Sequence, residues 1–262
     1  MKVKEIVQFL DKRYTKDIAS DIDQGKLGLQ IGRLDQEVKK ILLTLDVTKE
    51  VLEEANNAGA NFIISHHPFI FFPILSITDE NQTGELITQI IKQDICIYNM
   101  HTNLDLAKGG VNDSLAEALE IQNIKQVSAE DATEAYIRNG IVPSQTLRDF
   151  SLFVKAKLDL KMVKVVGDLN KTIQTVGILG GAGSAISEQK RATIAGCDCY
   201  ITSEVKHHEA LYAKFSPLAL IEIPHSAEVQ FVHKVKEVID EFTNKKTDCL
   251  ITSVSTDPFS YL

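Results

Sequence analysis

The sequence predicts an α/β fold made of two related lobes. Apolar, strand-like runs alternate with helix-like segments along most of the chain, a pattern that favours parallel βα units. The order strand, helix, strand, paired histidines, helix, strand, single histidine also occurs twice. We therefore expect one lobe over residues 1–125 and a second over residues 126–262, with a C-terminal segment that can pack back on the first lobe.

In the first half, local signals indicate where each element begins and ends. Thr48 offers the hydroxyl of a helix N-cap, and Gly59 can end the same helix. Proline disfavours helix in the residue before it, so the strand ahead of Pro68 should lead into a loop. We expect helices at residues 3–10, 49–58, 84–92 and 111–118, and strands at residues 27–32, 40–45, 60–64 and 95–99.

The second half repeats this order after a less regular stretch at residues 131–169. Within that stretch, residues 136–142 are strand-like and residues 147–158 are helix-like. Beyond it we expect a strand at residues 175–179, a glycine-rich turn at 180–184, a helix ending at Ala195, a strand through Cys197 and Cys199, and a strand at 218–223. The turn has neither the third glycine of a dinucleotide fingerprint nor the Gly-Lys-Ser/Thr of a P-loop, although its backbone amides could receive a phosphate.

Composition excludes several classes of protein. A chain of 262 residues with 44% hydrophobic residues is an ordinary globular composition, and a formal net charge of −8 argues against a general nucleic-acid binder. The first residues carry several charges and no apolar stretch typical of a signal peptide, and no run approaches the roughly 20 apolar residues of a membrane span. We expect a cytoplasmic protein. The four cysteines have no metal-binding spacing and are expected to be buried, small apolar residues.

Histidines and acids gather where the expected strands end. Of the seven histidines, only His233 lies away from a strand end. Open α/β sheets bind their ligands at the carboxyl ends of strands, so this clustering indicates a functional site. The set comprises His66, His67, His101, Asp105, Glu204, His207, His208, His225 and Glu228.

Imidazole and carboxylate groups together are typical ligands of zinc, iron and manganese. The adjacent His66 and His67 project in different directions, so they suit two ions side by side better than one. Asp105 and Glu228 could bridge two ions about 3.5–4 Å apart, an arrangement that activates water in hydrolytic two-metal sites. No Ser-His-Asp or HExxH pattern offers another mechanism, and a closed structural zinc site, which is usually cysteine-rich, is not expected.

These motifs resemble the NGG-interacting-factor-like family of dinuclear-metal proteins, whose bacterial members are often called GTP cyclohydrolase I type 2 homologues. The resemblance covers nearly the whole chain. It rests on the segments LGLQIG (27–32), ISHHP (64–68), HTNLD (101–105), GGAGS (180–184) and TDPF (256–259).

From the repeat we expect the strand ends of the two lobes to face a common cleft that holds the metal site. The resemblance implies a toroidal hexamer whose metal sites face an inner cavity. It assigns two divalent ions to His66, His67, Asp105, His225 and Glu228, with His101 and His208 lining the site. This chain departs from the family pattern at two places. Pro224 stands where the family has glycine, and Thr202-Ser203-Glu204 stands where the family has Thr-Gly-Asp.

Two functions from different classes follow. The first is a two-metal hydrolase of a small, nucleotide-like substrate, similar to GTP cyclohydrolase I type 2, in which His101 or His208 moves protons. The second is a metal carrier or ring-shaped scaffold that binds protein partners without catalysis. Turnover of nucleotides and phosphodiesters by the metal-loaded protein separates the two.

Overall fold

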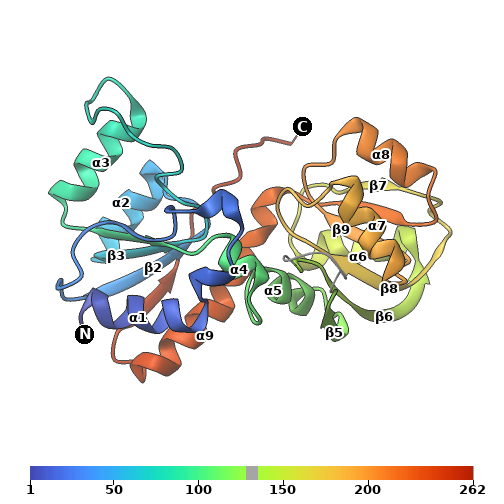
Figure 1. Cartoon of the computed structure of the whole chain (residues 1–262), viewed down its shortest axis with the longest axis horizontal. Coiled ribbons are helices and arrows are strands. Elements are labelled where there is room, and N and C mark those ends of the chain that lie inside the picture. Colours follow the sequence, from blue (N-terminus) through green and yellow to red (C-terminus); the bar gives the residue numbers. More distant parts are fainter. Residues whose placement is uncertain (128–134, 262) are drawn as a thin grey trace. The chain divides into compact units, whose positions relative to one another are not determined.

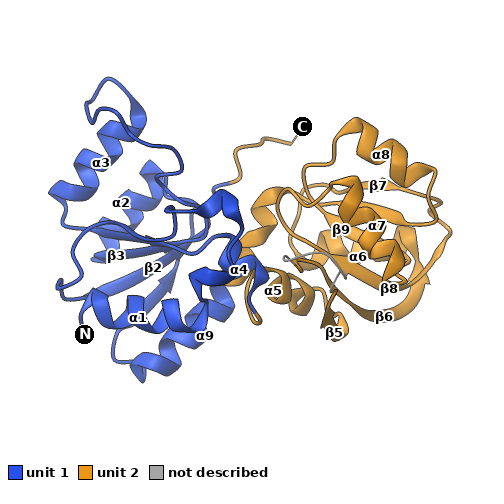
Figure 2. Ribbon diagram, in the orientation of Figure 1, with its two compact units in different colours: residues 1–107, 232–256 blue, residues 108–231, 257–262 orange. Residues whose placement is uncertain are grey.

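A computed structural model describes residues 1–127 and 135–261, and part of the irregular stretch expected at 131–169 therefore lies outside the described residues. The chain divides into two compact units (Figure 2). The first unit comprises residues 1–107 and 232–256, and the second comprises residues 108–231 and 257–262. In the part of the chain that is described, no helix has both the length and the apolar character needed to cross a membrane.

The first unit is built on a five-stranded sheet with the strand order β1-β4-β3-β2-β11. Strands β2, β3, β4 and β11 run parallel, and β1 pairs antiparallel with β4. The strands are β1 (Gly28–Ile31), β2 (Lys40–Thr44), β3 (Phe62–Ser65), β4 (Cys96–Asn99) and β11 (Asp248–Ile251).

Helices cover both faces of this sheet, with α2 and α3 on one face and α1 and α9 on the other (Figure 1). Thr48 accepts a hydrogen bond from the backbone of Val51 at the start of α2, and Gly59 ends that helix at φ +70°, as the sequence predicts. The rings of Phe9 on α1 and Phe242 on α9 stack with centroids 4.0 Å apart. The helices are α1 (Val3–Arg13), α2 (Lys49–Ala58), α3 (Gln82–Lys92), α4 (Thr102–Leu106) and α9 (Phe231–Thr243).

The second unit contains a six-stranded sheet with the order β5-β6-β8-β9-β10-β7. Its centre is parallel, since β8, β9 and β10 all run the same way, whereas β6 and β7 are antiparallel to their inner neighbours. The strands are β5 (Gln122–Gln126), β6 (Arg138–Thr146), β7 (Lys164–Val166), β8 (Thr172–Ile178), β9 (Cys199–Thr202) and β10 (Ala219–Glu222). The helices are α5 (Val111–Ala118), α6 (Leu147–Lys157), α7 (Ile186–Ile194) and α8 (His207–Lys214), with the 3₁₀ segment η3 (His225–Gln230).

The predicted α/β class is confirmed, and the central part of each sheet has the same arrangement of strands and helices. In each unit three parallel strands alternate with helices, as β2-α2-β3-α3-β4 and as β8-α7-β9-α8-β10. Each trio carries an antiparallel strand beside its last member, β1 in the first unit and β7 in the second. The four cysteines are buried, as expected, and burial raises the pKa of the Cys197 and Cys249 thiols to about 12.

Candidate metal centre

The carboxyl ends of the three central strands of the first unit bring functional side chains to one edge of the sheet. His66 and His67 follow β3 directly, Asp46 lies just beyond β2, and His101 lies just beyond β4. Because these strands are parallel and adjacent, residues that follow them meet at the same edge. His66 is buried, with 1% of its surface exposed.

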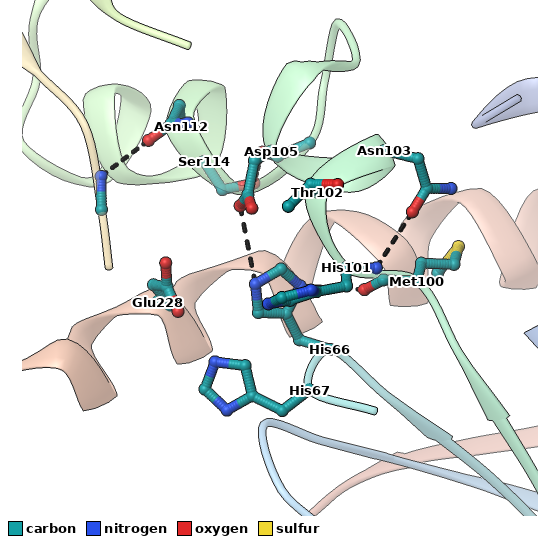
Figure 3. Close-up of polar contacts among 12 residues, drawn as sticks. His66, His67, Met100, His101, Thr102, Asn103, Asp105, Asn112, Ser114 and Glu228 are labelled. Atoms are coloured by element: carbon teal, nitrogen blue, oxygen red, sulfur yellow. Dashed lines mark hydrogen bonds and ion pairs between the residues drawn. The ribbon is translucent and has the colours of Figure 1, made fainter. Parts of the chain in front are cut away.

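Three imidazoles converge at this edge, as Figure 3 shows. The ring centroids of His66 and His67 are 5.0 Å apart, those of His66 and His101 are 5.2 Å apart, and those of His67 and His101 are 5.7 Å apart. One ring nitrogen from each histidine lies within 4.8 Å of the others, so this group could hold a metal ion.

The Nδ1 atom of each of these histidines lies within hydrogen-bond distance of an oxygen atom. The Nδ1 atom of His66 lies 2.9 Å from the carbonyl oxygen of Met100, which can only accept, so His66 is protonated at Nδ1 and its Nε2 carries the lone pair when the ring is neutral. His67 Nδ1 lies 2.6 Å from Asp46 Oδ1, and His101 Nδ1 lies 2.8 Å from Asp23 Oδ1. This arrangement directs the Nε2 atoms toward a shared ligand, as in metal sites whose histidines donate their other nitrogen to a carboxylate or carbonyl.

The two aspartates were not among the residues that the sequence predicted. Burial acts to raise the pKa of Asp46, but hydrogen bonds from His67 and Thr256 outweigh it and hold that pKa below its ordinary value. Thr256, the first residue of the TDPF segment, donates to Asp46 Oδ2 over 2.6 Å. The sequence did offer a signal for Asp46, because it is an acid just beyond a predicted strand. Neighbouring parallel strands bring the residues that follow them to the same edge of the sheet.

Asp23 serves His101 in the same way. Its carboxylate accepts from the backbone nitrogen of Thr102 at 2.9 Å and from the Thr102 hydroxyl at 2.5 Å. Burial acts to raise the pKa of Asp23, but the hydrogen bonds from His101 and Thr102 outweigh it. The pKa of Asp23 therefore lies below its ordinary value. A polar 3₁₀ turn (Asp21–Asp23) carries this residue, and nothing in the local sequence marks its partner.

Asp105 lies on α4, the short helix that begins directly after His101. Its Oδ1 atom is 3.5 Å from His66 Nε2 (Figure 3). Asn103 fixes this turn, since its side-chain oxygen accepts from the His101 backbone at 2.9 Å and its Nδ2 donates to the carbonyl of Tyr14 at 2.7 Å. The structure therefore brings His66, His67, His101 and Asp105 together within the first unit.

The LGLQIG segment supports the loop that follows the histidine pair. Gln30 on β1 donates to the carbonyl of Ile70 at 2.8 Å and accepts from its backbone nitrogen at 3.0 Å. These paired bonds hold the chain just beyond Pro68, which explains a polar glutamine within an otherwise apolar strand.

The second unit carries its own His–Glu cluster on η3. His225 Nε2 lies 3.0 Å from Glu228 Oε2, and His225 Nδ1 lies 2.7 Å from Glu204 Oε1. Glu204 therefore holds His225 as Asp46 holds His67, and glutamate in place of the family's aspartate retains the carboxylate. Pro224 has φ −57°, an ordinary value for proline, and its carbonyl accepts from Ala227, so proline is accommodated ahead of His225.

The glycine-rich segment packs against this cluster. Gly181 has φ +63°, and a Cβ atom there would lie 2.5 Å from Glu228 Oε1 and 3.4 Å from His225 Nε2. Asn112 accepts from the backbone nitrogen of Gly180 at 2.8 Å and fixes the turn (Figure 3). The turn was predicted, and its glycine is needed because only hydrogen leaves room for the carboxylate.

His207 and His208 form the first turn of α8, whereas His66 and His67 lie before any helix. The side chain of His208 is 67% exposed, and its Nε2 lies 4.0 Å from Glu209 Oε1. Among the described contacts within the second unit, none joins His208 to His225 or Glu228. Its predicted catalytic role stays a prediction.

Comparison with known proteins adds the family. A model of the Duf34/NIF3 (NGG1p interacting factor 3) family matches residues 1–258. The chain belongs to the DUF34/NIF3 family. Among its relatives, a Clostridium perfringens protein named GTP cyclohydrolase 1 type 2 homolog is 29% identical over 268 residues, which span 100% of both chains.

Solved structures of this family share the fold. A hypothetical protein from Staphylococcus aureus aligns with a TM-score of 0.93 and 31% identity, covering 100% of this chain and 99% of the other. A Bacillus cereus protein described as related to NIF3 aligns with a TM-score of 0.91 and 27% identity, with the same coverage. The resemblance stated from the sequence motifs is thus confirmed.

Proposed function

We propose that this DUF34/NIF3 protein binds two divalent metal ions and hydrolyses a small, nucleotide-like molecule. His66, His67 and Asp105 of the first unit and His225 and Glu228 of the second would supply the ligands, as the family resemblance implies. The donor set is nitrogen and carboxylate oxygen, which suits zinc, iron or manganese.

The anchoring of the histidines supports this proposal most strongly. Each of the three imidazoles has its Nδ1 atom within hydrogen-bond distance of a carbonyl or carboxylate oxygen. Their Nε2 atoms are left for a common metal ion, and the three histidines are close enough to hold one. A histidine that serves only packing needs no such convergence, whereas a metal ligand needs its tautomer fixed. His225 has the same pattern, with Glu204 at Nδ1 and Glu228 at Nε2.

The protein's own residues have separable tasks in this proposal. Bound divalent ions would polarise an electrophilic substrate atom and make water more acidic. His101 would accept or donate a proton at Nε2 while Asp23 holds its Nδ1–H and compensates the imidazolium charge. Because Asp23 stays ionised at neutral pH, it can hold the same tautomer of His101 through the cycle.

The substrate class takes its support from the relatives' names. Curated relatives from Clostridium perfringens and Streptococcus pneumoniae, each 29% identical, carry the name GTP cyclohydrolase 1 type 2 homolog. We propose a nucleotide-like substrate on that basis, with hydrolysis as the reaction class.

The test is turnover by the metal-loaded protein. Protein purified without added metal is analysed for its native metal, reloaded with that metal, and incubated with a panel of nucleotides and phosphodiesters. We expect hydrolysis of at least one nucleotide and a large loss of rate in His101→Ala. Complete inertness together with readily exchanged metal would contradict the hydrolase and favour the metal carrier.

The toroidal hexamer implied by the resemblance is a separate prediction, checked by light scattering of the purified chain.

A further inference from the structure

A cavity of about 540 Å³ lies in the second unit, and every residue that lines it belongs to that unit. The cavity is of the size that holds small organic ligands in proteins. His225 and Glu204 form part of its wall, so it adjoins the His–Glu cluster.

Most of the wall is apolar and includes two aromatic rings. Ile223 and Pro224 contribute to the wall, and Phe259 and Tyr261 contribute from the C-terminal segment. Phe259 is 71% exposed, so its ring is accessible to a ligand that enters the cavity. The Tyr261 hydroxyl donates to Asp257 over 3.0 Å and ties the segment to itself. Aromatic side chains of this kind pack well against the face or edge of another flat ring.

Besides Glu204, the wall of this cavity carries a pair of oppositely charged side chains. Lys164 on β7 and Glu222 on β10 are directly opposite each other in the antiparallel pair, and Lys164 Nζ lies 3.0 Å from Glu222 Oε1. An ammonium has three donors and a carboxylate has two acceptor oxygens, so each keeps capacity beyond their mutual bond. Side by side, they present a donor next to an acceptor.

We infer that this cavity binds a planar heterocycle with a cyclic-amide edge, in which a ring carbonyl lies beside a ring N–H. Lys164 donates to the carbonyl, Glu222 accepts from the N–H, and the aromatic wall contacts the ring face. The remainder of the ligand extends toward His225. The inference rests on the proposed function in one respect, since it makes this ligand the substrate of the metal centre.

Isothermal titration with guanosine tests the inference on the full chain. Guanosine has the cyclic-amide edge, and 1-methylguanosine has the same ring but lacks the N–H. We expect 1-methylguanosine to bind about tenfold more weakly than guanosine, since one charge-assisted hydrogen bond is lost. Lys164→Met and Phe259→Ala should each weaken guanosine binding by about tenfold.

Lys157→Met is the matched control, because Lys157 also pairs with a glutamate, Glu120, in the second unit but does not line the cavity. Its guanosine affinity should equal that of the wild type. No binding of guanosine at millimolar concentration, or equal affinity in the wild type, Lys164→Met and Phe259→Ala, overturns the inference.

Metal content of the same preparations separates this inference from the proposed function. Retained metal with no guanosine binding overturns the cavity assignment alone. Guanosine binding that depends on Lys164 and Phe259 in protein that retains no metal supports the cavity and contradicts the metal-dependent function instead.

Discussion

At His66, a backbone carbonyl decides which ring nitrogen carries the proton. Met100 is the residue after β4, and its carbonyl lies 2.9 Å from His66 Nδ1. The protein thus needs no charged partner to fix this tautomer, whereas His67 and His101 each rely on an aspartate. A buried imidazole held by a neutral carbonyl carries no extra charge into the core, which suits a residue that is 1% exposed.

The sequence predicted the histidines themselves but not the residues that orient them. His66, His67, His101 and Asp105 are recognisable because their chemical types and their positions after strands suggest ligands. Asp23 and Asp46 lie 78 and 21 residues from the histidines that they hold. Such pairings depend on which strands and turns are neighbours in space. The position of Asp46 after a predicted strand was a usable signal, whereas nothing in the local sequence linked Asp23 to His101.

Asp46→Asn tests the orienting role at this scale. The amide can offer its NH₂ group as well as its oxygen to His67, so the tautomer of His67 is no longer fixed. We expect the metal dissociation constant to rise about 10- to 100-fold with no change in circular dichroism. Competition against a chromogenic chelator measures the affinity. Asp35→Asn, at an acid whose side chain is 81% exposed, is the control and should bind metal as the wild type does.

At the scale of elements, segments with clear cap residues or apolar periodicity were predicted well, whereas short edge strands and the helix α9 (Phe231–Thr243) were not predicted. Helix α2 begins and ends where its cap residues indicate. Strand β5 has one apolar residue, Ile124, among four exposed polar residues, so it has no apolar alternation to detect. Strand β7 spans only Lys164–Val166 and is defined by its pairing with β10 rather than by its own composition.

The glycine-rich turn gives a prediction about packing. Gly181→Ala places a methyl group against Glu228 Oε1, and it should weaken metal binding at least about tenfold by displacing that carboxylate. It should also cost about 1–2 kcal/mol of stability from the left-handed backbone. Gly196→Ala is a close control, since Gly196 has φ +77° and no atom within 4 Å of the added Cβ. A chelator assay on both variants should show a metal defect in Gly181→Ala only, and an equal defect in both would refute the contact.

The end of β11 predicts a dependence of stability on pH. Glu54 on α2 accepts from the backbone nitrogen of Ser253 at 2.8 Å and from its hydroxyl at 2.6 Å, and it also pairs with Thr252. Burial raises the pKa of Glu54, but these bonds lower it more, so the folded-state pKa lies below the ordinary value. The carboxylate therefore stabilises the fold above its unfolded-state pKa, and this stabilisation is lost as pH falls through the folded-state pKa.

Glu54→Gln should accordingly reduce the free energy of unfolding by about 1–2 kcal/mol at pH 7 and by less at an acidic pH below the folded-state pKa of Glu54, where the carboxyl is protonated and uncharged like the amide. Urea unfolding at the two pH values measures the difference. A penalty that is equal at both pH values would mean that the charge of Glu54 contributes nothing.

At the scale of the whole molecule, the same arrangement of strands and helices occurs in both units. Each unit has three parallel strands joined by helices, and each places a histidine after the last of these strands, His101 after β4 and His225 after β10. In both units a carboxylate from elsewhere holds the Nδ1 atom of a histidine at that edge. The repeated order of motifs predicted this likeness. The second histidine pair departs from the repeat because it lies within α8 instead of before it.

The proposed metal centre depends on Asp105 more directly than on any other acid of the first unit, because its Oδ1 atom lies 3.5 Å from His66 Nε2. Elemental analysis of the purified chain by mass spectrometry tests this claim. We predict about two divalent ions per wild-type chain and a loss of bound metal in Asp105→Ala, with the melting temperature nearly unchanged and with Asp35→Ala as the control. Full metal occupancy in folded Asp105→Ala, equal to that of the wild type, would contradict the account.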